Sequence, residues 1–282
     1  MSAPYHRPRD LSVALDLLAS GGLSIAAGCT DLFPATERKH LPGAVLDLTG
    51  VVGLRGIQVS AAGVRIGATT TWSDLLETSL PGAFDGLRLA AQQIGPRQIQ
   101  NQATIVGNLC NASPAADGVP PLLTLDAVIE IQSKTAVRQV ALDRFIKGPR
   151  HVDLQQGEMV TAILIPSAAL GGASHFSKLG ARDYLVISIA MTAARVRIEE
   201  GVVMQAALAI GSCGPKAVRL NEVEQRMIGK PFDPSIVTDE GVATAISPIT
   251  DMRATADYRR HSAAELMRRT LAVLGSNLQV MA

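Results

Sequence analysis

The chain has 282 residues, of which 47% are hydrophobic and 18% charged, and its formal net charge is +1. This composition is typical of a globular protein with enough apolar residues for two or three packed units. Because Lys and Arg form no continuous run and only 3% of the residues are aromatic, the sequence does not favour a nucleic-acid-binding protein.

The three cysteines, Cys29, Cys110 and Cys213, lie far apart in the chain. Their number and spacing predict neither a disulfide framework nor a metal or iron–sulfur ligand set. No uninterrupted apolar stretch of about 20 residues predicts a membrane span, and the polar, proline-rich N-terminus lacks the apolar core of a signal peptide. We therefore expect a cytoplasmic protein.

Residues 1–57 have the pattern of a small βαβ-like unit. A helix is predicted over 10–19, with Asp10 as its N-cap. The short apolar run 23–27 predicts a buried strand, and 44–48 predicts a second strand. We assign this region as the first subdomain.

Residues 58–172 combine strands and helices and form the predicted second subdomain. The expected strands are 64–71, 128–132, 137–140 and 159–166, and the expected helices begin at Thr71 and cover 86–93 and 120–125. Between them we expect a polar loop over 95–102 and a further loop rich in small residues over 103–117. The run Gly171–Ser174 marks the predicted boundary to the next domain.

Residues 173–282 show strands followed by helices, which is an α+β pattern. Strands over 186–198 and 203–210, with Gly201 between them, predict a hairpin, and helices are expected over 220–227 and 263–274. We therefore predict a C-terminal α+β domain with an antiparallel sheet and helices.

The segment Ala27–Leu32 follows a predicted strand and could bind an anion. Gly28 and Cys29 are small enough for close approach of a ligand, peptide N–H groups in such a turn can line up toward a pyrophosphate, and Thr30 adds a hydroxyl. The alternative is a strand-to-helix turn with Thr30 or Asp31 as N-cap. Asp31 would repel a phosphate unless it points away, which favours a structural role for it.

A second candidate segment runs from Thr104 to Asn108 and on to Asp117. Gly107 permits close backbone approach, Asn108 can donate and accept, and Asp117 could accept hydrogen bonds from a ribose. The alternative is a polar loop whose side chains satisfy its own backbone. Two such turns in separate subdomains are what a dinucleotide held between them requires, although the Rossmann GxGxxG pattern is absent.

At these segments the sequence resembles the FAD-binding subunits of the xanthine dehydrogenase and carbon monoxide dehydrogenase family. The family's Ala-Gly-Gly-Thr-Asp-Leu turn is matched by Ala27–Leu32, and its Ile-Arg-Asn-x-Ala-Thr-Ile-Gly-Gly-Asn segment by Ile99–Asn108. Further matches, in order along the chain, are Ser113–Asp117, Phe176–Arg182, Ile210–Arg219 and Asp251–Arg260. The resemblance implies two FAD-binding subdomains of the vanillyl-alcohol-oxidase type followed by the C-terminal α+β domain.

The resemblance also implies roles for individual residues. The backbone of two segments would hold the FAD pyrophosphate, Asp117 would bind the ribose or the nearby ADP portion, Ile94 and Val160 would lie against the ring system, and Lys178 would lie near the polar edge of the flavin. The two backbone segments consist of Ala27, Gly28, Cys29, Thr30, Asp31 and Leu32, and of Thr104, Ile105, Val106, Gly107 and Asn108.

Three positions depart from the family pattern. Cys29 and Val106 replace glycines, and Gln100 replaces an arginine near the phosphates. A β-branched residue is strained at positive φ, so we expect the backbone to adjust or to take a negative φ, with FAD binding retained. A redox role for Cys29 is less favoured than that of a small residue in a glycine-sized site, because no second cysteine is close in sequence.

In this family, a large partner subunit carries the molybdenum cofactor and a small one carries 2Fe–2S clusters. The resemblance therefore implies an electron-transfer subunit in a dimer of heterotrimers, with no catalytic residue and no metal of its own. The interval from Leu109 to Arg138 holds a single cysteine and no insertion, which argues against the branch with an additional 4Fe–4S cluster. The alternatives are a self-contained FAD-dependent oxidoreductase and a flavin-free scaffold subunit of the same fold.

Overall fold

Short parallel strands form the first unit of the computed structural model, which describes residues 4–37, 41 and 43–281. The sheet has the order β1-β3-β2, and α1 lies between β1 and β2 in the chain. Parallel pairing of both outer strands with β3 confirms the predicted βαβ-like arrangement. The first three residues of the polar N-terminus lie outside the described residues. The bounds are β1 (Tyr5–His6), α1 (Leu11–Ala19), β2 (Leu23–Ala26) and β3 (Ala44–Asp47).

Two details of this unit differ from the prediction. The strand β2 is not buried: Ala26 is its only buried residue, and Ile25 is 37% exposed. The reason is that β2 is an edge strand, and Ile25 borders the open cavity described below. Asp10 does occupy the N-cap position of α1, but its side chain forms no capping hydrogen bond.

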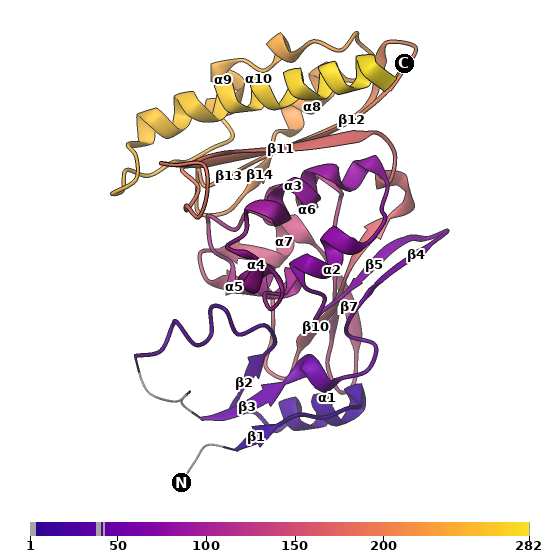
Figure 1. Ribbon diagram of the computed structural model, residues 1–282, viewed down its shortest axis with the longest axis vertical. Coiled ribbons are helices and arrows are strands. Elements are labelled where there is room, and N and C mark those ends of the chain that lie inside the picture. Colours follow the sequence, from indigo (N-terminus) through magenta and orange to yellow (C-terminus); the bar gives the residue numbers. More distant parts are fainter. Residues whose placement is uncertain (1–3, 38–40, 42, 282) are drawn as a thin grey trace.

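An antiparallel sheet with helices on one face forms the second unit (Figure 1). The strand order is β4-β5-β10-β6-β7, so β10, the last of these strands in the chain, lies at the centre. The predicted strands are confirmed, although β5 ends at Gly67. The strands are β4 (Ile57–Ser60), β5 (Gly63–Gly67), β6 (Val128–Gln132), β7 (Val137–Ala141) and β10 (Met159–Pro166), and the helices are α2 (Trp72–Glu77), α3 (Asp85–Gln93), α4 (Arg97–Gln100), α5 (Ile105–Asn111), α6 (Val119–Thr124) and α7 (Leu142–Phe145). A separate two-stranded sheet pairs β8 (Ile146–Gly148) with β9 (His151–Val152).

Two segments predicted as loops contain helices. The expected polar loop over 95–102 includes α4, and the expected small-residue loop over 103–117 begins with α5. The second prediction was wrong because Thr104 is an N-cap: its Oγ1 accepts a hydrogen bond of 3.0 Å from the N–H of Gly107. Such a cap offsets the low helix propensity of the glycine within the first turn.

The C-terminal domain is a four-stranded antiparallel sheet of order β11-β12-β13-β14. The predicted hairpin is confirmed, with Gly201 at φ 78° in the turn between β12 and β13. Residues 186–189 were predicted as part of a strand but precede β12. The strand β11 was not predicted, because its residues were assigned to a domain boundary and to a motif. The bounds are β11 (Ala173–Leu179), β12 (Ala190–Glu199), β13 (Val202–Gly211) and β14 (Val218–Arg219).

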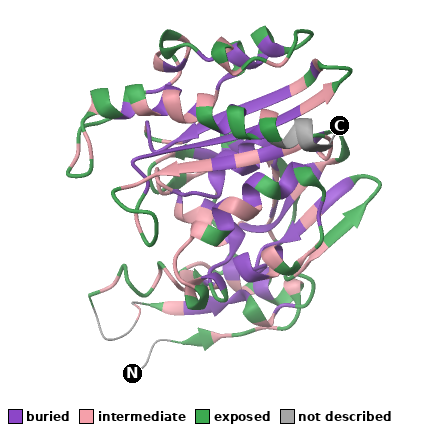
Figure 2. Ribbon diagram, turned by 45° about the horizontal axis from the view of Figure 1, so that its top comes forward, coloured by how far each residue is buried: buried purple, intermediate pink, exposed green. Residues whose placement is uncertain are grey.

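Helices cover both faces of this sheet (Figure 1). On the outer face lie α8 (Asn221–Met227), α9 (Asp239–Ala243) and α10 (Ala256–Met281), which is longer than the predicted 263–274. On the inner face, α3 packs on β11 and α6 packs on β12 and β13, so the helices of the second unit form a middle layer between the two sheets. Figure 2 shows the buried residues concentrated in this middle layer and along the strands. Among the described residues, no helix combines the length and apolar character needed to cross a lipid bilayer.

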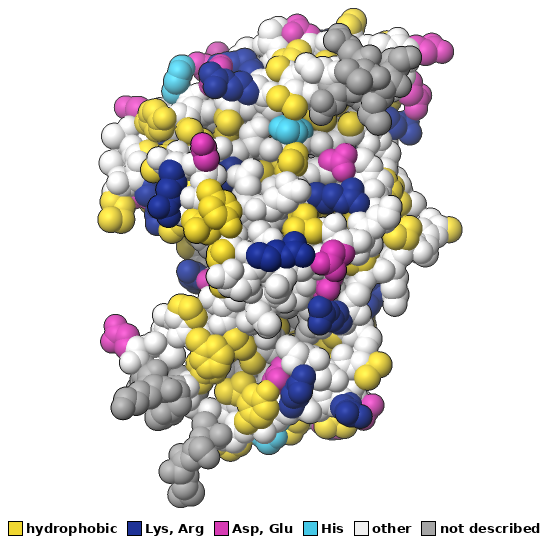
Figure 3. Space-filling model, viewed as in Figure 1, with side chains coloured by type: hydrophobic (Ala, Val, Ile, Leu, Met, Phe, Trp, Pro, Cys, Tyr) yellow, Lys and Arg dark blue, Asp and Glu magenta, His cyan; other side chains and the backbone are white. Residues whose placement is uncertain are grey.

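The surface carries no basic stripe on the face that Figure 3 shows, where Lys and Arg side chains alternate with Asp, Glu and apolar groups. Among the described residues, however, two arginines are buried. The side chain of Arg195 on β12 is 4% exposed, and its Nε donates to the carbonyl of Thr124 in α6 over 2.7 Å. This bond joins the C-terminal domain to the middle layer.

Arg259 is the second buried arginine, and it fixes the N-terminal turn of α10. Its Nη1 donates to the carbonyls of Ile189 and Ser212, and its Nη2 donates to Asp251 Oδ1 over 2.7 Å. Partial desolvation disfavours the ionised form of Asp251, but hydrogen bonds from the backbone N–H of Arg253 and from Arg259 outweigh it and lower the pKa of this carboxyl to about 2.

The lowered pKa of Asp251 predicts a specific acid sensitivity. Because the folded-state pKa lies below the ordinary value of 3.8, the stabilisation is present above pH 4 and is lost as the pH falls toward 2. We expect Asp251→Asn to lower the free energy of unfolding at pH 7 by about 1–2 kcal/mol and to flatten its pH dependence below pH 4.

Urea unfolding between pH 7 and pH 3 measures both effects. The matched control is Asp257→Asn, whose side chain is 92% exposed in the first turn of α10, and it should change the free energy by less than about 0.5 kcal/mol. An unchanged pH slope in Asp251→Asn would show that this carboxyl does not stabilise the fold.

Candidate functional site

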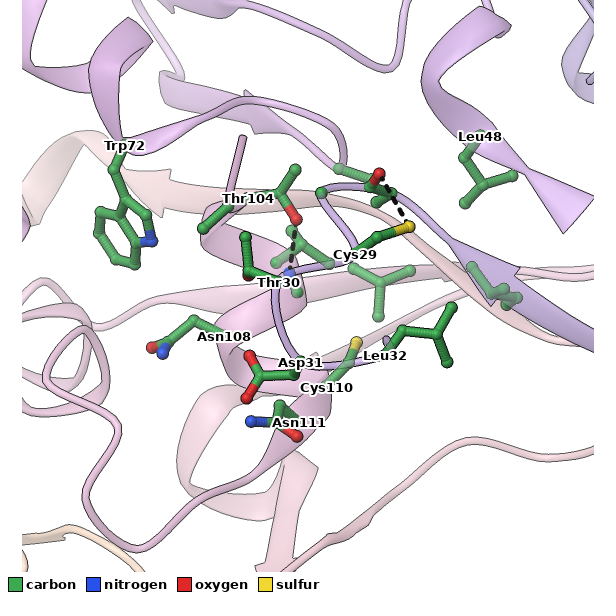
Figure 4. A pocket seen from close by; sticks show the side chains of 18 of the residues that line it. Cys29, Thr30, Asp31, Leu32, Leu48, Trp72, Thr104, Asn108, Cys110 and Asn111 are labelled. Carbon is green, nitrogen blue, oxygen red and sulfur yellow. Dashed lines mark hydrogen bonds between the residues drawn. The ribbon is translucent and has the colours of Figure 1, made fainter. Parts of the chain in front are cut away.

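A cavity of about 580 Å³ lies where the first unit meets the second. This volume is within the range of cofactor and ligand pockets. Its walls come from the loop after β2, from α5 and from the first residues of the central strand β10 (Figure 4). The predicted residues among the lining are Ala27, Gly28, Cys29, Thr30, Asp31, Leu32, Ile94, Thr104, Val106, Gly107, Asn108 and Val160. The structure therefore brings both candidate segments to one site.

The loop over 27–32 presents its backbone to the cavity. It is a series of turns with no helix, so the alternative of a helix N-cap at Thr30 or Asp31 was wrong. Within the described part of the chain, no hydrogen bond uses the N–H groups of Thr30, Asp31 or Leu32 as donors. These donors are available to an anionic ligand, as predicted for a pyrophosphate.

Gly28 is required for a contact within the protein. A Cβ at this position would lie 2.0 Å from the carbonyl oxygen of Gln102 and 2.8 Å from the Cα of Ala103. The loop after β2 therefore rests directly on the backbone that leads into α5. The sequence interpretation assigned this glycine to close approach of a ligand, whereas in the structure it allows close approach of the second subdomain.

The α5 segment offers fewer free donors than its motif suggests. The N–H of Ile105 donates to the carbonyl of Thr70, and the N–H of Asn108 donates to the carbonyl of Thr104. The N–H of Gly107 is used by the Thr104 cap, one of the two bonds dashed in Figure 4. Ile105 itself is fully buried and is not part of the lining. The loop over 27–32, rather than α5, is the main source of unused N–H groups.

The two replaced glycines behave differently. Val106 lies in the first turn of α5, where φ is not positive, so its β-branched side chain is unstrained. Cys29 has a φ of 59°, in the left-handed region that glycine adopts without penalty. The expectation of an adjusted or negative φ is therefore wrong at Cys29.

Both cysteines that line the cavity are neutral thiols. Burial, with a smaller contribution from Asp47, raises the pKa of Cys29, and burial raises the pKa of Cys110 to about 12. A thiol is reactive chiefly as the thiolate. These environments therefore favour the interpretation of Cys29 as a small residue in a glycine-sized site.

Asp117 and Lys178 lie outside the lining and bind each other. Lys178 Nζ donates to one carboxylate oxygen of Asp117 over 2.6 Å, and Ser188 Oγ donates to the other over 2.6 Å. Burial raises the pKa of Asp117, against the lowering effect of Lys178. Both oxygens of the carboxylate already have partners, and ligand contact at these two residues stays a prediction.

Several lining residues were not predicted from the sequence. The most notable is Trp72 at the start of α2, and the others include Ile25, Leu48, Ala68 and Met159. Trp72 follows the capping residue Thr71, so a helix start was predictable. Its position in the cavity depends on the packing of α2 against residues 103–104, which no local pattern encodes.

Comparison with known proteins gives matches along nearly the whole chain. Residues 1–168 match a family described as "FAD binding domain in molybdopterin dehydrogenase", and residues 175–274 match "CO dehydrogenase flavoprotein C-terminal domain". The chain is 32% identical to a xanthine dehydrogenase FAD-binding subunit from Escherichia coli, with 98% of this chain and 99% of that protein covered. A carbon monoxide dehydrogenase medium chain from Hydrogenophaga pseudoflava is 27% identical, with 95% of each chain covered.

Solved structures agree with these matches. A chain of carbon monoxide dehydrogenase from Hydrogenophaga pseudoflava superposes with a TM-score of 0.90 at 26% sequence identity, covering 98% of both chains. The overall fold is therefore that of this structure.

The contact at Gly28 predicts a steric effect of a single methyl group. Gly28→Ala places a Cβ into the Gln102 carbonyl, so the two subdomains must separate. We expect the free energy of unfolding to fall by about 1–3 kcal/mol and the dissociation constant for FAD to rise at least roughly tenfold, which is about 1.4 kcal/mol. Isothermal titration with FAD and urea unfolding measure the two effects.

The control for this variant is Gly148→Ala, because a Cβ at Gly148 would meet no atom within 4 Å. It should leave both quantities unchanged. Normal FAD affinity in Gly28→Ala would contradict the inferred contact.

The positive φ at Cys29 predicts that glycine is the better residue there. Cys29→Gly removes backbone strain and should raise the free energy of unfolding by up to about 1 kcal/mol. FAD affinity should be equal or higher, because the loop is held in its observed conformation without strain.

Glu200, at φ 49° in the exposed turn of the β12–β13 hairpin, is the matched control. Glu200→Gly should give a similar gain in stability with no change in FAD affinity. A loss of FAD affinity in Cys29→Gly would mean that the cysteine side chain itself contributes to binding.

Proposed function

Since the chain belongs to the FAD-binding medium subunits of molybdenum hydroxylases of the xanthine and carbon monoxide dehydrogenase type, we propose that it relays electrons from the 2Fe–2S clusters of a small partner subunit to an external acceptor. One observation carries the proposal: both predicted segments line a single cavity of about 580 Å³. In this role, the chain positions its cofactor and does not bind the substrate.

The residues around the cavity fit FAD. The N–H groups of Thr30, Asp31 and Leu32 would hold the pyrophosphate, because they lack partners among the described residues. Ile94 and Val160 are apolar lining residues that would contact a ring system. Bound FAD supplies the redox chemistry, and the protein supplies binding, orientation and exclusion of water.

The proposed assembly contains three kinds of subunit. We propose a large subunit with the molybdenum cofactor and a small one with the clusters, assembled as a dimer of heterotrimers in the cytoplasm. The relative from Hydrogenophaga pseudoflava carries the name "medium chain", which supports such an assembly. Within this chain we propose the units 1–57 and 58–172 for FAD and 173–282 as the third.

Two alternatives predict different behaviour. A self-contained flavoenzyme would need its own acid–base groups at the cavity. The lining of this cavity is mostly apolar, and among the described residues that line it Asp31 is the only one with a carboxylate. A flavin-free scaffold would have no use for a cavity lined by unpaired N–H groups.

The test uses the complex purified through a tag on this chain. We expect FAD, molybdenum and iron in the complex, and a yellow FAD-containing medium subunit after dissociation that oxidises no substrate alone. Mixing this subunit with the chemically reduced small subunit should bleach its flavin absorption, because electrons move from the clusters to the flavin.

Gly148→Ala serves as the matched control, because that glycine lies away from the cavity lining. In Gly28→Ala the decrease in flavin absorption should be smaller, in proportion to the FAD that the variant has lost. A colourless subunit that takes up no FAD would support the scaffold alternative. Substrate turnover by the chain alone would support the self-contained enzyme.

A further inference from the structure

The indole of Trp72 is a buried donor without a partner at the cavity. Trp72 is 0% exposed and lines the cavity, yet its Nε1 has no hydrogen-bond partner among the described residues. Leaving a buried N–H unpaired is costly, and nearly all such groups in folded proteins have a partner. An unpaired donor in the wall of a ligand cavity therefore indicates a bond that forms when the ligand binds.

A second unpaired group faces the same end of the cavity. The Oδ1 atom of Asn108 is also buried without a partner. A Cβ on Gly118 would lie 2.5 Å from Trp72 Cη2 and 2.9 Å from Asn108 Oδ1, so both side chains pack against that glycine. Figure 4 shows Trp72 and Asn108 on the same side of the site, with the indole nitrogen directed toward its interior.

The surroundings hold these two groups in place. Thr71 and Asp74 form a reciprocal capping box at the start of α2, which fixes the backbone of Trp72. Gly118 directly follows Asp117, whose carboxylate is bound by Lys178 of the C-terminal domain. The donor and the acceptor are thus preorganised at the end of the cavity nearest that domain.

A donor and an acceptor on two side chains that pack against the same glycine select a particular ligand group. A phosphate oxygen accepts hydrogen bonds but offers no proton to Asn108 Oδ1, and an apolar ring edge satisfies neither atom. A hydroxyl accepts one bond and donates another. The sugar portions of a dinucleotide, its ribityl chain and its ribose, are rich in this group.

We propose that Trp72 Nε1 and Asn108 Oδ1 together bind one sugar hydroxyl of FAD, with Trp72 as the donor. The inference rests on the proposed function, and it adds Trp72, which lies outside the motifs that identify the family, to Asn108, which ends the Ile99–Asn108 motif. It makes Trp72 a binding residue for the cofactor, with no part in electron transfer.

The primary test replaces the indole by a phenyl ring. Trp72→Phe keeps an aromatic ring against Gly118 but removes the N–H. We expect the dissociation constant for FAD to rise about tenfold, because the ligand hydroxyl loses its donor. The thermal stability of the FAD-free chain should be unchanged or higher, because an unpaired buried donor has been removed; a purely structural tryptophan would instead show a clear loss.

FAD analogues identify the hydroxyl. Titrations of both proteins use FAD molecules that lack one ribityl hydroxyl at a time and one that contains 2′-deoxyadenosine. When the analogue lacks the hydroxyl that Trp72 binds, Trp72→Phe should not raise the dissociation constant further, because the protein change and the ligand change remove the same hydrogen bond. Leu48→Met, a lining variant without a polar group, is the matched control and should show no such dependence.

A direct readout follows from the composition, because Trp72 is the only tryptophan in the chain. Its indole N–H gives one NMR resonance, which should move to lower field when FAD binds and stay in place with the critical deoxy analogue. Equal tenfold losses with every analogue, or an unmoved resonance with FAD bound, would overturn this inference alone. Failure of the unmodified chain to bind FAD would instead overturn the proposed function.

Discussion

The close contact between Gly28 and the backbone of Gln102 is the constraint on which the cavity depends. With a Cβ position only 2.0 Å from that carbonyl, any side chain would push the first unit away from the second. The cavity has one wall from each unit, so its width is set by this contact. One side of this short loop faces the cavity, and its other side rests on the backbone of Gln102 and Ala103, which leads into α5.

The sequence predicted the pairing of the two segments correctly but assigned the wrong local structure to one of them. The apolar alternation in β6 and β10 is a strong local signal, and both strands form as expected. The Thr104 segment was predicted as a loop, because Gly107 suggested a turn. The segment is instead a helix with a capping hydrogen bond of 3.0 Å at Thr104. Several N–H groups that were predicted to bind the ligand therefore donate to atoms of the protein.

Contacts between distant residues account for what the sequence could not show. Asp117 and Lys178 were predicted as separate ligand contacts, but in the structure they form an ion pair with each other. They are 61 positions apart in the chain, so no local pattern indicates this pairing. The burial of Trp72 and its position at the cavity likewise depend on how α2 packs against the residues before α5. Composition and periodicity describe each element by itself, whereas these contacts depend on how the elements pack together.

The two positions where this chain replaces a family glycine, Cys29 and Val106, differ in what the backbone requires. At Val106 the helix supplies an ordinary backbone conformation, so a branched side chain fits and adds to the buried core. At Cys29 the turn has a φ of 59°, and a residue other than glycine is accommodated there as strain. The loop presents the unpaired N–H groups of Thr30, Asp31 and Leu32 in this conformation, and the adjacent Gly28 rests against the backbone of the second unit.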